Sequence, residues 1–299
     1  MVSNFIEKGA SVSFALTACN LSKSSYYYHP KEGKRGRKPS LVVQHFDGSF
    51  VDLPFVLDCI KRLLNQEFVD YGYSKVTTWL RRYEHLIINK KRVYKLMKEH
   101  NLLAQRIRRN KKGKLWGTGI WRSLDCPFTY LQTDIKYIYI HGEHRNALLV
   151  SIIDCYSKAI LSYKLAWSVR KQTVINLVQE MLSRYQFPKE IILRSDNGSQ
   201  YEAGLFREYL SEMNIQHEFT HIASPQENCY IESFHSIVER TICRVYDFET
   251  IEEAKEVFHR FMNFYNLERL HGGIGNKSPQ ELLKEIDTKK TLKLFQIEN

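Results

Sequence analysis

A change of pattern near residue 129 constrains this chain more than any other feature of its sequence. From there onward, β-branched and aromatic residues recur in short runs, which is typical of strands. The predicted strands span Tyr130–Ile140, Arg145–Asp154 and Ile160–Trp167, with Gly142 at the first turn. Because these strands follow one another at short intervals, we expect an antiparallel meander.

The residues after this meander alternate between helix and strand patterns. The predicted elements are a helix at Thr173–Tyr185, a strand at Glu190–Arg194, a helix at Ala203–Met213 and a strand at Gln216–Phe219. A long helix follows, with a buried stripe formed by Ile231, Phe234, Val238, Ile242 and Val245. A capping box, Thr250-Ile-Glu-Glu253, begins a last helix that continues through Asn266. The predicted order is β-β-β-α-β-α-β-α.

The residues before the meander are expected to be helical. Within residues 1–30, a helical stretch around Ser13–Cys19 and a second short helix capped by Ser22 suggest a small helix-turn-helix remnant. Three further helices are predicted at Phe55–Asn65, Ser74–Tyr83 and Asn89–His100, with Ser74 and Asn89 as caps. These three helices predict a helix-turn-helix domain, and the third presents lysines as a recognition helix would.

Positive charge is concentrated in the N-terminal two-fifths of the chain. The net charge is +11, and residues 1–122 hold 24 Lys and Arg against 9 Asp and Glu, or +15. The remaining residues therefore carry a net charge of −4. A segregated basic region is expected of a part that meets a polyanion, and nucleic acid is the leading candidate. A solvated basic surface is the alternative.

Other features of the composition exclude several classes of protein. No apolar run approaches the roughly 18 residues that a membrane span needs, so no membrane association is expected. The N-terminal residues lack a signal-peptide pattern, which predicts a cytosolic protein. The six cysteines are scattered without a C-x-x-C pair, which argues against a disulfide framework and a structural zinc site. Without such a pair, His217 and His221 are better explained as residues of a strand and its loop.

Three acidic residues occupy positions where acids are structurally awkward. Asp134 interrupts the apolar alternation of the first strand, and aspartate forms strands poorly. Asp196 follows a buried strand at the turn Asn197-Gly198, which places it at the carboxyl edge where ligands gather in α/β sheets. Glu232 lies beside the apolar stripe of the long helix and can face that edge. Individually, each acid also has an ordinary explanation as a cap, a turn residue or a surface glutamate.

The residues around these acids resemble the retroviral-integrase superfamily, and specifically the OrfB-type transposases of the third bacterial insertion-sequence family. The motifs similar to the family's first two are Thr133-Asp134-Ile135-Lys136-Tyr137-Ile138 and Ser195-Asp196-Asn197-Gly198-Ser199-Gln200-Tyr201. Residues 224–234 resemble its third motif, and the 35 residues between Asp196 and Glu232 fit the D,D-35-E type. The C-terminal signature is resembled by Tyr265-Asn266-Leu-Glu-Arg269-Leu-His271-Gly272 and Ser278-Pro279, and the helix-turn-helix by Tyr71-Gly72-Tyr73 and residues 89–97.

This resemblance implies a fold and a chemistry. The fold is an α/β (α+β) ribonuclease H-like catalytic core, with a mixed five-stranded sheet flanked by helices, preceded by all-α helix-turn-helix regions. Asp134, Asp196 and Glu232 would be the catalytic residues and would hold Mg²⁺ or Mn²⁺, two ions per site. The implied reaction is nicking at the 3′ ends of an insertion sequence, followed by strand transfer during DNA transposition and integration.

The resemblance also implies partners and a location. The expected partners are double-stranded DNA, at the terminal inverted repeats and at the target, and further copies of this chain in at least a dimer. A fusion partner encoded in an upstream reading frame is a further expectation. The expected location is the bacterial cytosol and nucleoid.

The residues predicted to contact DNA lie in the basic linkers, in the helix-turn-helix domain and beside the acids. They are Arg35, Arg37, Lys75, Lys90, Lys91, Arg92, Lys95, Arg106, Arg108, Arg109, Lys136 and Asn197. Arg35-Gly36-Arg37 is similar to the core of minor-groove hooks, although an ordinary linker explains it more simply.

The expected boundaries follow from these patterns. They are 1–30 for the helix-turn-helix remnant, 31–52 for a basic linker, 53–105 for the helix-turn-helix domain, 106–125 for a second basic linker, 126–248 for the catalytic core and 249–299 for a C-terminal helical extension.

Two alternatives to a transposase stay open, together with one competing acid. A ribonuclease H-type nuclease would share the acids but would not need the basic helix-turn-helix domain. A DNA-binding regulator descended from a transposase would be expected to have lost one acid. Glu227 stands where the family usually has glycine and could compete with Glu232, whereas Asp154 and Asp125 are interpreted as structural and linker residues.

Overall fold

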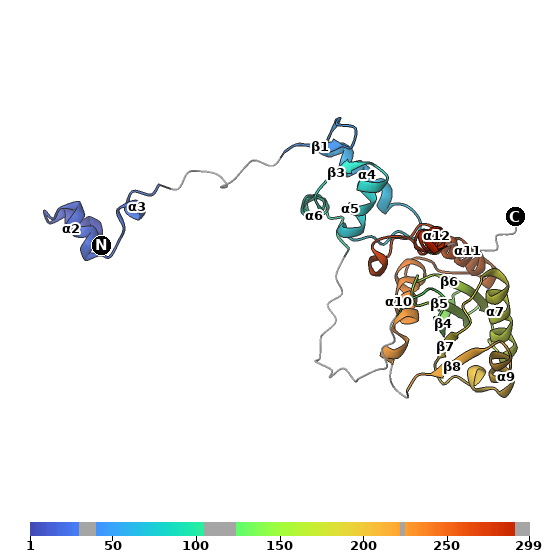
Figure 1. Cartoon of the computed structure of the whole chain (residues 1–299). Coiled ribbons are helices and arrows are strands. Elements are labelled where there is room, and N and C mark those ends of the chain that lie inside the picture. The colour runs from blue at the N-terminus through green and yellow to red at the C-terminus, as the bar shows by residue number, and fades with distance from the viewer. Residues whose placement is uncertain (30–39, 105–123, 222–224, 291–299) are drawn as a thin grey trace. The chain divides into compact units, whose positions relative to one another are not determined.

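The structure, a computed structural model, describes residues 1–29, 40–104, 124–221 and 225–290 (Figure 1). The chain forms two compact units, Met1–Leu41 and Val42–Asn299. Within the described ranges, no helix has the length and apolar character needed to cross a membrane. Several predicted DNA contacts lie outside the described residues, namely Arg35, Arg37, Arg106, Arg108 and Arg109.

The first unit contains three short helices, α1 (Val2–Glu7), α2 (Val12–Ala18) and α3 (Lys23–Tyr26). The side chains of Ser11 and Ser22 cap α2 and α3 by accepting hydrogen bonds from backbone N–H groups in the first turn. The cap predicted at Ser22 is therefore confirmed. Helix α1 was not predicted, because six residues are too few to show a helical period.

The second unit begins with the predicted helix-turn-helix helices and a small sheet. Its elements are β1 (Val42–His45), β2 (Phe50–Asp52), α4 (Leu53–Leu64), α5 (Tyr73–Arg82), β3 (Leu86–Ile87) and α6 (Lys90–Glu99). The strands pair in the order β2-β1-β3. The sequence predicted a linker up to residue 52 and an all-α region here. Strands of two to four residues are too short to show a pattern of alternation.

Side-chain caps explain where two of these helices begin. Asp52 accepts a hydrogen bond from the N–H of Phe55 at the start of α4, and Asn89 accepts one from the N–H of Lys91 at the start of α6. The prediction for Asn89 is confirmed. The prediction of Ser74 as a cap is wrong, because α5 begins one residue earlier and places Ser74 inside its first turn.

A mixed five-stranded sheet forms the centre of the second unit. Its strands are β4 (Tyr130–Ile140), β5 (Arg145–Asp154), β6 (Ile160–Ala166), β7 (Ile191–Ser195) and β8 (Ile215–Phe219). Their order is β6-β5-β4-β7-β8. The first three strands form the predicted antiparallel meander, whereas β7 pairs in parallel with both β4 and β8. At the first turn Gly142 is needed, because a Cβ there would lie 2.4 Å from the carbonyl oxygen of Glu249.

Helices cover both faces of this sheet (Figure 1). The helices of the core are α7 (Lys171–Arg184), α8 (Ser199–Glu202), α9 (Gly204–Glu212), the 3₁₀ helix η1 (Pro225–Asn228), α10 (Cys229–Val238) and α11 (Ile251–Leu267). One apolar core joins the sheet to α10 and α11 through Phe234, Phe258 and Phe261. A second core joins it to α7 and α9 through Val174 and Phe206. The sheet therefore lies between two layers of helices.

The helix that carries Glu232 is shorter than predicted. It ends as an α-helix at Val238 and continues as one π-helical segment, η2 (Glu239–Cys243). The predicted stripe is buried as far as Ile242, but Val245 is 67% exposed. The helix ends at Cys243, so Val245 lies two residues beyond it. The prediction that Val245 belongs to the buried stripe is therefore wrong.

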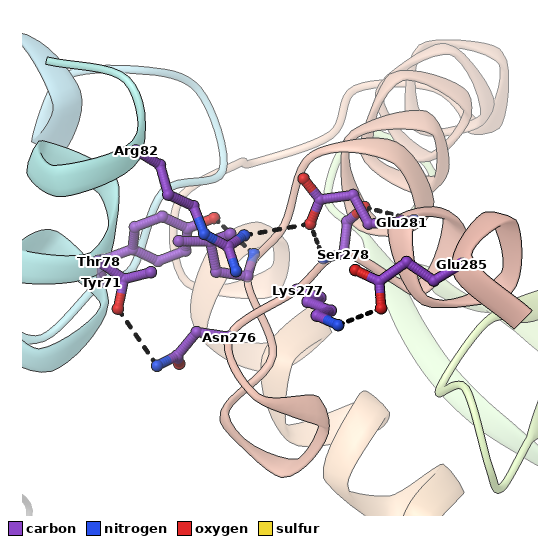
Figure 2. A network of polar contacts seen from close by, with 9 residues as sticks. Tyr71, Thr78, Arg82, Asn276, Lys277, Ser278, Glu281 and Glu285 are labelled. Atoms are coloured by element: carbon purple, nitrogen blue, oxygen red, sulfur yellow. Dashed lines mark hydrogen bonds and ion pairs between the residues drawn. The ribbon is translucent and has the colours of Figure 1, made fainter. Parts of the chain in front are cut away.

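Helix α5 contacts the C-terminal part of the chain, which also contains the 3₁₀ helix η3 (Gly272–Ile274) and α12 (Pro279–Lys290). Figure 2 shows Arg82 paired with Glu281 at 3.3 Å and Asn276 donating to Thr78 at 3.3 Å. The hydroxyl of Tyr71 accepts a hydrogen bond from the N–H of Leu270 at 2.9 Å. These contacts attach the helix-turn-helix region to the C-terminal signature motif.

Candidate active site

Two acidic residues lie level with each other on neighbouring parallel strands. The last paired positions of β4 and β7 are Gln132 and Arg194. Asp134 and Asp196 each lie two residues beyond these positions. Because parallel strands advance together, the two aspartates lie side by side where β7 ends. The two acids that the sequence placed at this edge are therefore brought together.

The side chain of Gln132 fixes the start of α10, the helix that carries Glu232. Its Oε1 accepts hydrogen bonds from the N–H groups of Tyr230 and Ile231, both at 3.1 Å. Its Nε2 donates to the carbonyl of Glu227 at 2.8 Å. Gln132 is 1% exposed, so these bonds are shielded from water. The strand that carries Asp134 thus also positions the third acid.

Arg194 ties the second strand to the same segment. Its Nη1 donates to the carbonyl of Glu227 at 3.0 Å, and its Nη2 donates to the carboxylate of Glu218 on β8 at 3.0 Å. The guanidinium is buried. Both aspartate-bearing strands therefore hold the turn before α10, which fixes the position of that helix relative to the sheet edge.

Asp196 and Glu232 affect the ionisation of Asp134. Burial, together with the charges of Asp196 and Glu232, raises the pKa of Asp134 to about 6, although a hydrogen bond from the N–H of Ile135 acts in the opposite direction. Burial also raises the pKa of Glu232. In the described part of the chain, no three His, Cys, Asp or Glu side chains are arranged to hold a metal ion as they stand. The acids are close enough to repel one another, and they must approach further to share a cation.

A histidine that the sequence did not single out lies beside Asp134. The Nδ1 of His235 is 3.6 Å from Oδ2 of Asp134. Burial, and then the charge of Lys136, lower the pKa of His235 to about 4, so its ring is neutral at pH 7. The available signal was its position three residues after Glu232, since residues at that spacing share a helix face.

Tyr201, the last residue of the second motif, lies beneath the same edge. It is fully buried, and its hydroxyl is 3.2 Å from Oγ1 of Thr133, the residue before Asp134. Burial raises the pKa of Tyr201 above its usual range, so it stays a neutral hydrogen-bonding group. The motif therefore includes a residue that supports the strand.

Known protein families match most of the second unit. A family described as Integrase core domain matches residues 125–225, and a second of the same description matches residues 213–279. An HTH-like domain family matches residues 54–112. Among solved structures, the catalytic core domain of BIV integrase is similar over 55% of this chain and 99% of that chain, with 19% identity and a TM-score of 0.43.

Curated relatives are similar over most of their length. The transposase for insertion sequence element IS904 of Lactococcus lactis subsp. lactis (strain IL1403) is 24% identical, over 78% of this chain and 95% of that protein. The putative transposase InsK for insertion sequence element IS150 of Escherichia coli (strain K12) is 24% identical, over 89% of this chain and 91% of that protein. The chain belongs to the insertion-sequence transposases.

This membership confirms the fold class expected from the resemblance. The integrase-core matches cover the mixed five-stranded sheet and its flanking helices, and the HTH-like match covers α4, α5 and α6. The transposase is therefore an enzyme of the polynucleotidyl transferase type with an attached helix-turn-helix region.

In this transposase, the competing acid Glu227 is engaged elsewhere. Its carboxylate accepts a hydrogen bond from the N–H of His221 at 2.9 Å and lies 2.8 Å from Nδ1 of the same residue. Burial raises the pKa of Glu227, but the hydrogen bonds from His221 outweigh burial and lower it. His217 instead contacts Ser195 at 2.9 Å. The two histidines therefore have separate partners, which agrees with the prediction that they belong to a strand and its loop.

Asp154 has the structural role that the sequence suggested. It is fully buried at the end of β5 and accepts hydrogen bonds from the N–H groups of Phe128, Tyr156 and Ser157. Burial is the main influence on this carboxyl and raises its pKa. Asp154 thus holds the turn between β5 and β6.

The residues predicted to contact DNA fall into two groups. Lys90, Lys91 and Lys95 are exposed on α6 and are free to meet a duplex. Arg92 donates to the carbonyl of Val42 at 3.0 Å, so part of its hydrogen-bonding capacity holds the small sheet. The exposed lysines are therefore the stronger candidates.

The remaining predicted contacts lie closer to the core. Lys136 is paired with Glu239 at 3.0 Å, and Asn197 donates to the carbonyl of Thr220 at 3.0 Å. Lys75 is half-buried and lines a cavity beside α10 rather than the exposed face of α6. Lys136 and Asn197 therefore already have partners within the protein, and Lys75 is less exposed than the lysines of α6.

Proposed function

We propose that Asp134, Asp196 and Glu232 are the catalytic acids with which this transposase nicks DNA at insertion-sequence ends and transfers the freed strands to a target. One observation carries the proposal. Gln132 and Arg194, each two residues before an aspartate, both donate to the carbonyl of Glu227 at the start of the Glu232 helix. This shared anchor supports three acids acting at one edge.

The types of ligand at this edge fit magnesium or manganese. Carboxylate oxygens are the hard ligands that these ions prefer. Glu232 is exposed, so its side chain can turn toward the aspartates, and a cation would relieve the repulsion that raises the pKa of Asp134. Two such ions, when bound, activate the attacking oxygen and stabilise the leaving oxygen.

The chain's own side chains position the reactants and supply no nucleophile. Water attacks a phosphodiester at the element's end and frees a 3′-hydroxyl. That hydroxyl then attacks a phosphodiester of the target, forms a new P–O bond and displaces the target's own 3′-oxygen, which leaves as a hydroxyl. Asp134 must be ionised to bind a cation. Because His235 beside it is neutral at pH 7, the charge of Asp134 stays available.

Recognition of the element's ends falls to the helix-turn-helix region in this proposal. The exposed lysines of α6 would meet phosphates, and neighbouring side chains would read base edges. Two ends must be brought together, so we expect at least a dimer on DNA. A fusion partner encoded in an upstream reading frame is also part of the proposal. Complete end joining by this chain alone would contradict the need for that partner, but not the role of the acids.

The test is incubation of the full chain with an element-end duplex and Mg²⁺ or Mn²⁺. The wild type is expected to nick the duplex, whereas Asp196→Asn should not, while both bind the duplex. Asp247→Asn is the matched control, because Asp247 is an exposed acid of the core, 87% exposed. A wild type that neither nicks nor joins, or an equally active Asp196→Asn, would overturn the proposal.

A further inference from the structure

A cavity of about 480 Å³ lies against a different face of α10 from the one that carries Glu232. We call it the basic cavity. The polar side chains that line it include Lys75 of α5, Lys158, Ser233, Arg240, Arg269 and His271. It therefore joins the helix-turn-helix region, α10 and the C-terminal signature motif, for which no catalytic role has emerged.

The basic cavity contains more positive than negative charge. Asp70 pairs with Arg269 at 2.6 Å and with Arg240 at 3.0 Å. Within the described ranges, Lys75 and Lys158 form no ion pair; Lys158 donates to the carbonyl of Cys155 and lies over a tyrosine ring. Asp70 therefore serves Arg269, Arg240 and Lys75, and the carboxylate that acts on Lys158 is Asp154, so two carboxylates act on four cations.

Burial is the main influence on the ionisation of both lysines. Burial, and then the charge of Arg269, lower the pKa of Lys75 to about 8, although Asp70 acts in the opposite direction. Burial also lowers the pKa of Lys158. Cations crowded in this way gain free energy from a bound anion.

Three buried polar atoms of the cavity residues lack hydrogen-bond partners in the described part of the chain. They are Nε2 of His271 and both Nε and Nη1 of Arg269, whose residues are 8% and 1% exposed; Nη1 is ion-paired with Asp70. Buried polar groups are nearly always hydrogen-bonded in folded proteins. The chain alone therefore leaves hydrogen-bonding atoms without partners at the buried floor of the cavity, which His271 and Arg269 form.

The mouth of the basic cavity is accessible to solvent. The side chain of Arg240 is 48% exposed, and Gly272 and Gly273 are also exposed. The hydroxyl groups of Ser233 and Ser236 add further hydrogen-bond donors along α10. An anion can thus enter from the surface and meet cations, hydroxyl groups and the buried floor.

We propose that the basic cavity binds one phosphate group of the DNA backbone. The choice of DNA rests on the proposed function, whereas the preference for a phosphate follows from the excess of cations and hydroxyl donors. A phosphate held here would contact both Lys75 of the helix-turn-helix region and the helix that carries Glu232. It would fix the position of the DNA relative to the catalytic acids.

The test measures DNA affinity without catalysis. Fluorescence anisotropy of the full chain with a labelled duplex, in EDTA and over a series of salt concentrations, is compared for the wild type, Lys75→Gln and Lys158→Gln. Each variant should bind about tenfold more weakly and lower the slope of log affinity against log salt by about one, for end and unrelated duplexes alike. Lys171→Gln, at an exposed lysine that begins α7, should change neither.

Thermal unfolding in inorganic phosphate helps to distinguish a free phosphate ion from a phosphate of the DNA backbone as the anion in the cavity. Phosphate should raise the melting temperature of the wild type more than that of either cavity variant. If phosphate does so but both variants bind DNA like the wild type, the cavity holds a free anion and the proposal is overturned. If the variants lose affinity while the wild type fails to nick, the proposed function fails and the cavity proposal stands.

Discussion

The sheet edge that carries the acids and the helix that carries the lysines hold their charges in opposite ways. The side chain of Asp134 is 24% exposed, and its neighbour Gln132 anchors α10 through three hydrogen bonds. Lys95 on α6 is 62% exposed, and it is ion-paired with Glu99 of its own helix, at 3.6 Å. Chemistry needs groups held in fixed positions, whereas attraction to a polyanion needs only charge near a surface. Substitutions in the two regions should therefore differ in kind.

The largest effect should come from removing a carboxylate at the sheet edge. Glu232→Gln keeps the shape of the side chain but removes its charge, so we expect nicking to fall by about 10³-fold with DNA affinity unchanged. Glu227→Gln is the matched substitution five residues earlier, and it should retain most activity because Glu227 pairs with His221. Single-turnover nicking rates check both. If Glu227→Gln were the inactive variant, the assignment of the third acid would be wrong.

A smaller effect should come from the residue that positions α10. Gln132→Leu preserves volume but removes the hydrogen bonds to Glu227, Tyr230 and Ile231. We expect about a 10- to 100-fold lower rate, a higher Mg²⁺ requirement and about 3 kcal/mol lower stability. Rates over a Mg²⁺ series and urea unfolding measure these effects.

The control for this substitution is Gln172→Leu, at an exposed glutamine of α7 that bonds only to Asn176 within its own helix. It should change neither the rate nor the stability appreciably. Equal effects of the two leucine substitutions would remove the special role of Gln132.

A pH-dependent free energy of unfolding should distinguish the sheet edge that carries the acids from the helix that carries the lysines. The folded chain binds the Asp134 proton more tightly than the unfolded chain does, since burial raises its pKa from 3.8 to about 6. The stability that this adds is complete below about pH 4 and is lost as the pH rises through about 6. Without metal, Asp134→Asn should therefore gain about 2 kcal/mol relative to the wild type between pH 4 and pH 7.5. Urea unfolding at both pH values tests this, and a constant difference would contradict it.

The smallest effect should come from a single lysine of α6. Lys91→Gln should weaken DNA binding by about 1 kcal/mol and lower the salt slope by about one, without changing the nicking rate at saturating DNA. Lys255→Gln, at an exposed lysine of α11, is the matched control. Loss of nicking at saturating DNA would show that α6 takes part in the chemistry after all.

The sequence predicted the sheet edge that carries the acids because its strands have recognisable residue patterns. Runs of β-branched and aromatic residues located β4 and β5, and the break in alternation at Asp134 marked a residue that the fold alone does not require. A short buried run followed by the turn Asn197-Gly198 placed Asp196 at the end of β7. The spacing of Glu232 then came from the resemblance to a family, not from periodicity.

What the sequence could not predict depends on contacts between distant residues. Gln132 bonds to a carbonyl 95 residues away, and no period records such a contact. The helix that carries Glu232 ends at Cys243 after a π-helical segment, and Val245 beyond it is exposed. The attachment of the helix-turn-helix region through Asp70 and Arg269 is equally invisible in the pattern of the chain. The domain boundaries expected from the sequence therefore stay a prediction.

The central claim is that Asp134, Asp196 and Glu232 share one divalent-metal site. Calorimetric titration of Mn²⁺ into the full chain tests it most directly, with Asp134→Asn, Asp196→Asn and Glu232→Gln beside the wild type and Asp247→Asn as control. We predict that the wild type and the control bind Mn²⁺ alike, and that each of the three variants binds at least about tenfold more weakly. Equal Mn²⁺ affinity in the wild type and the three variants would contradict the account.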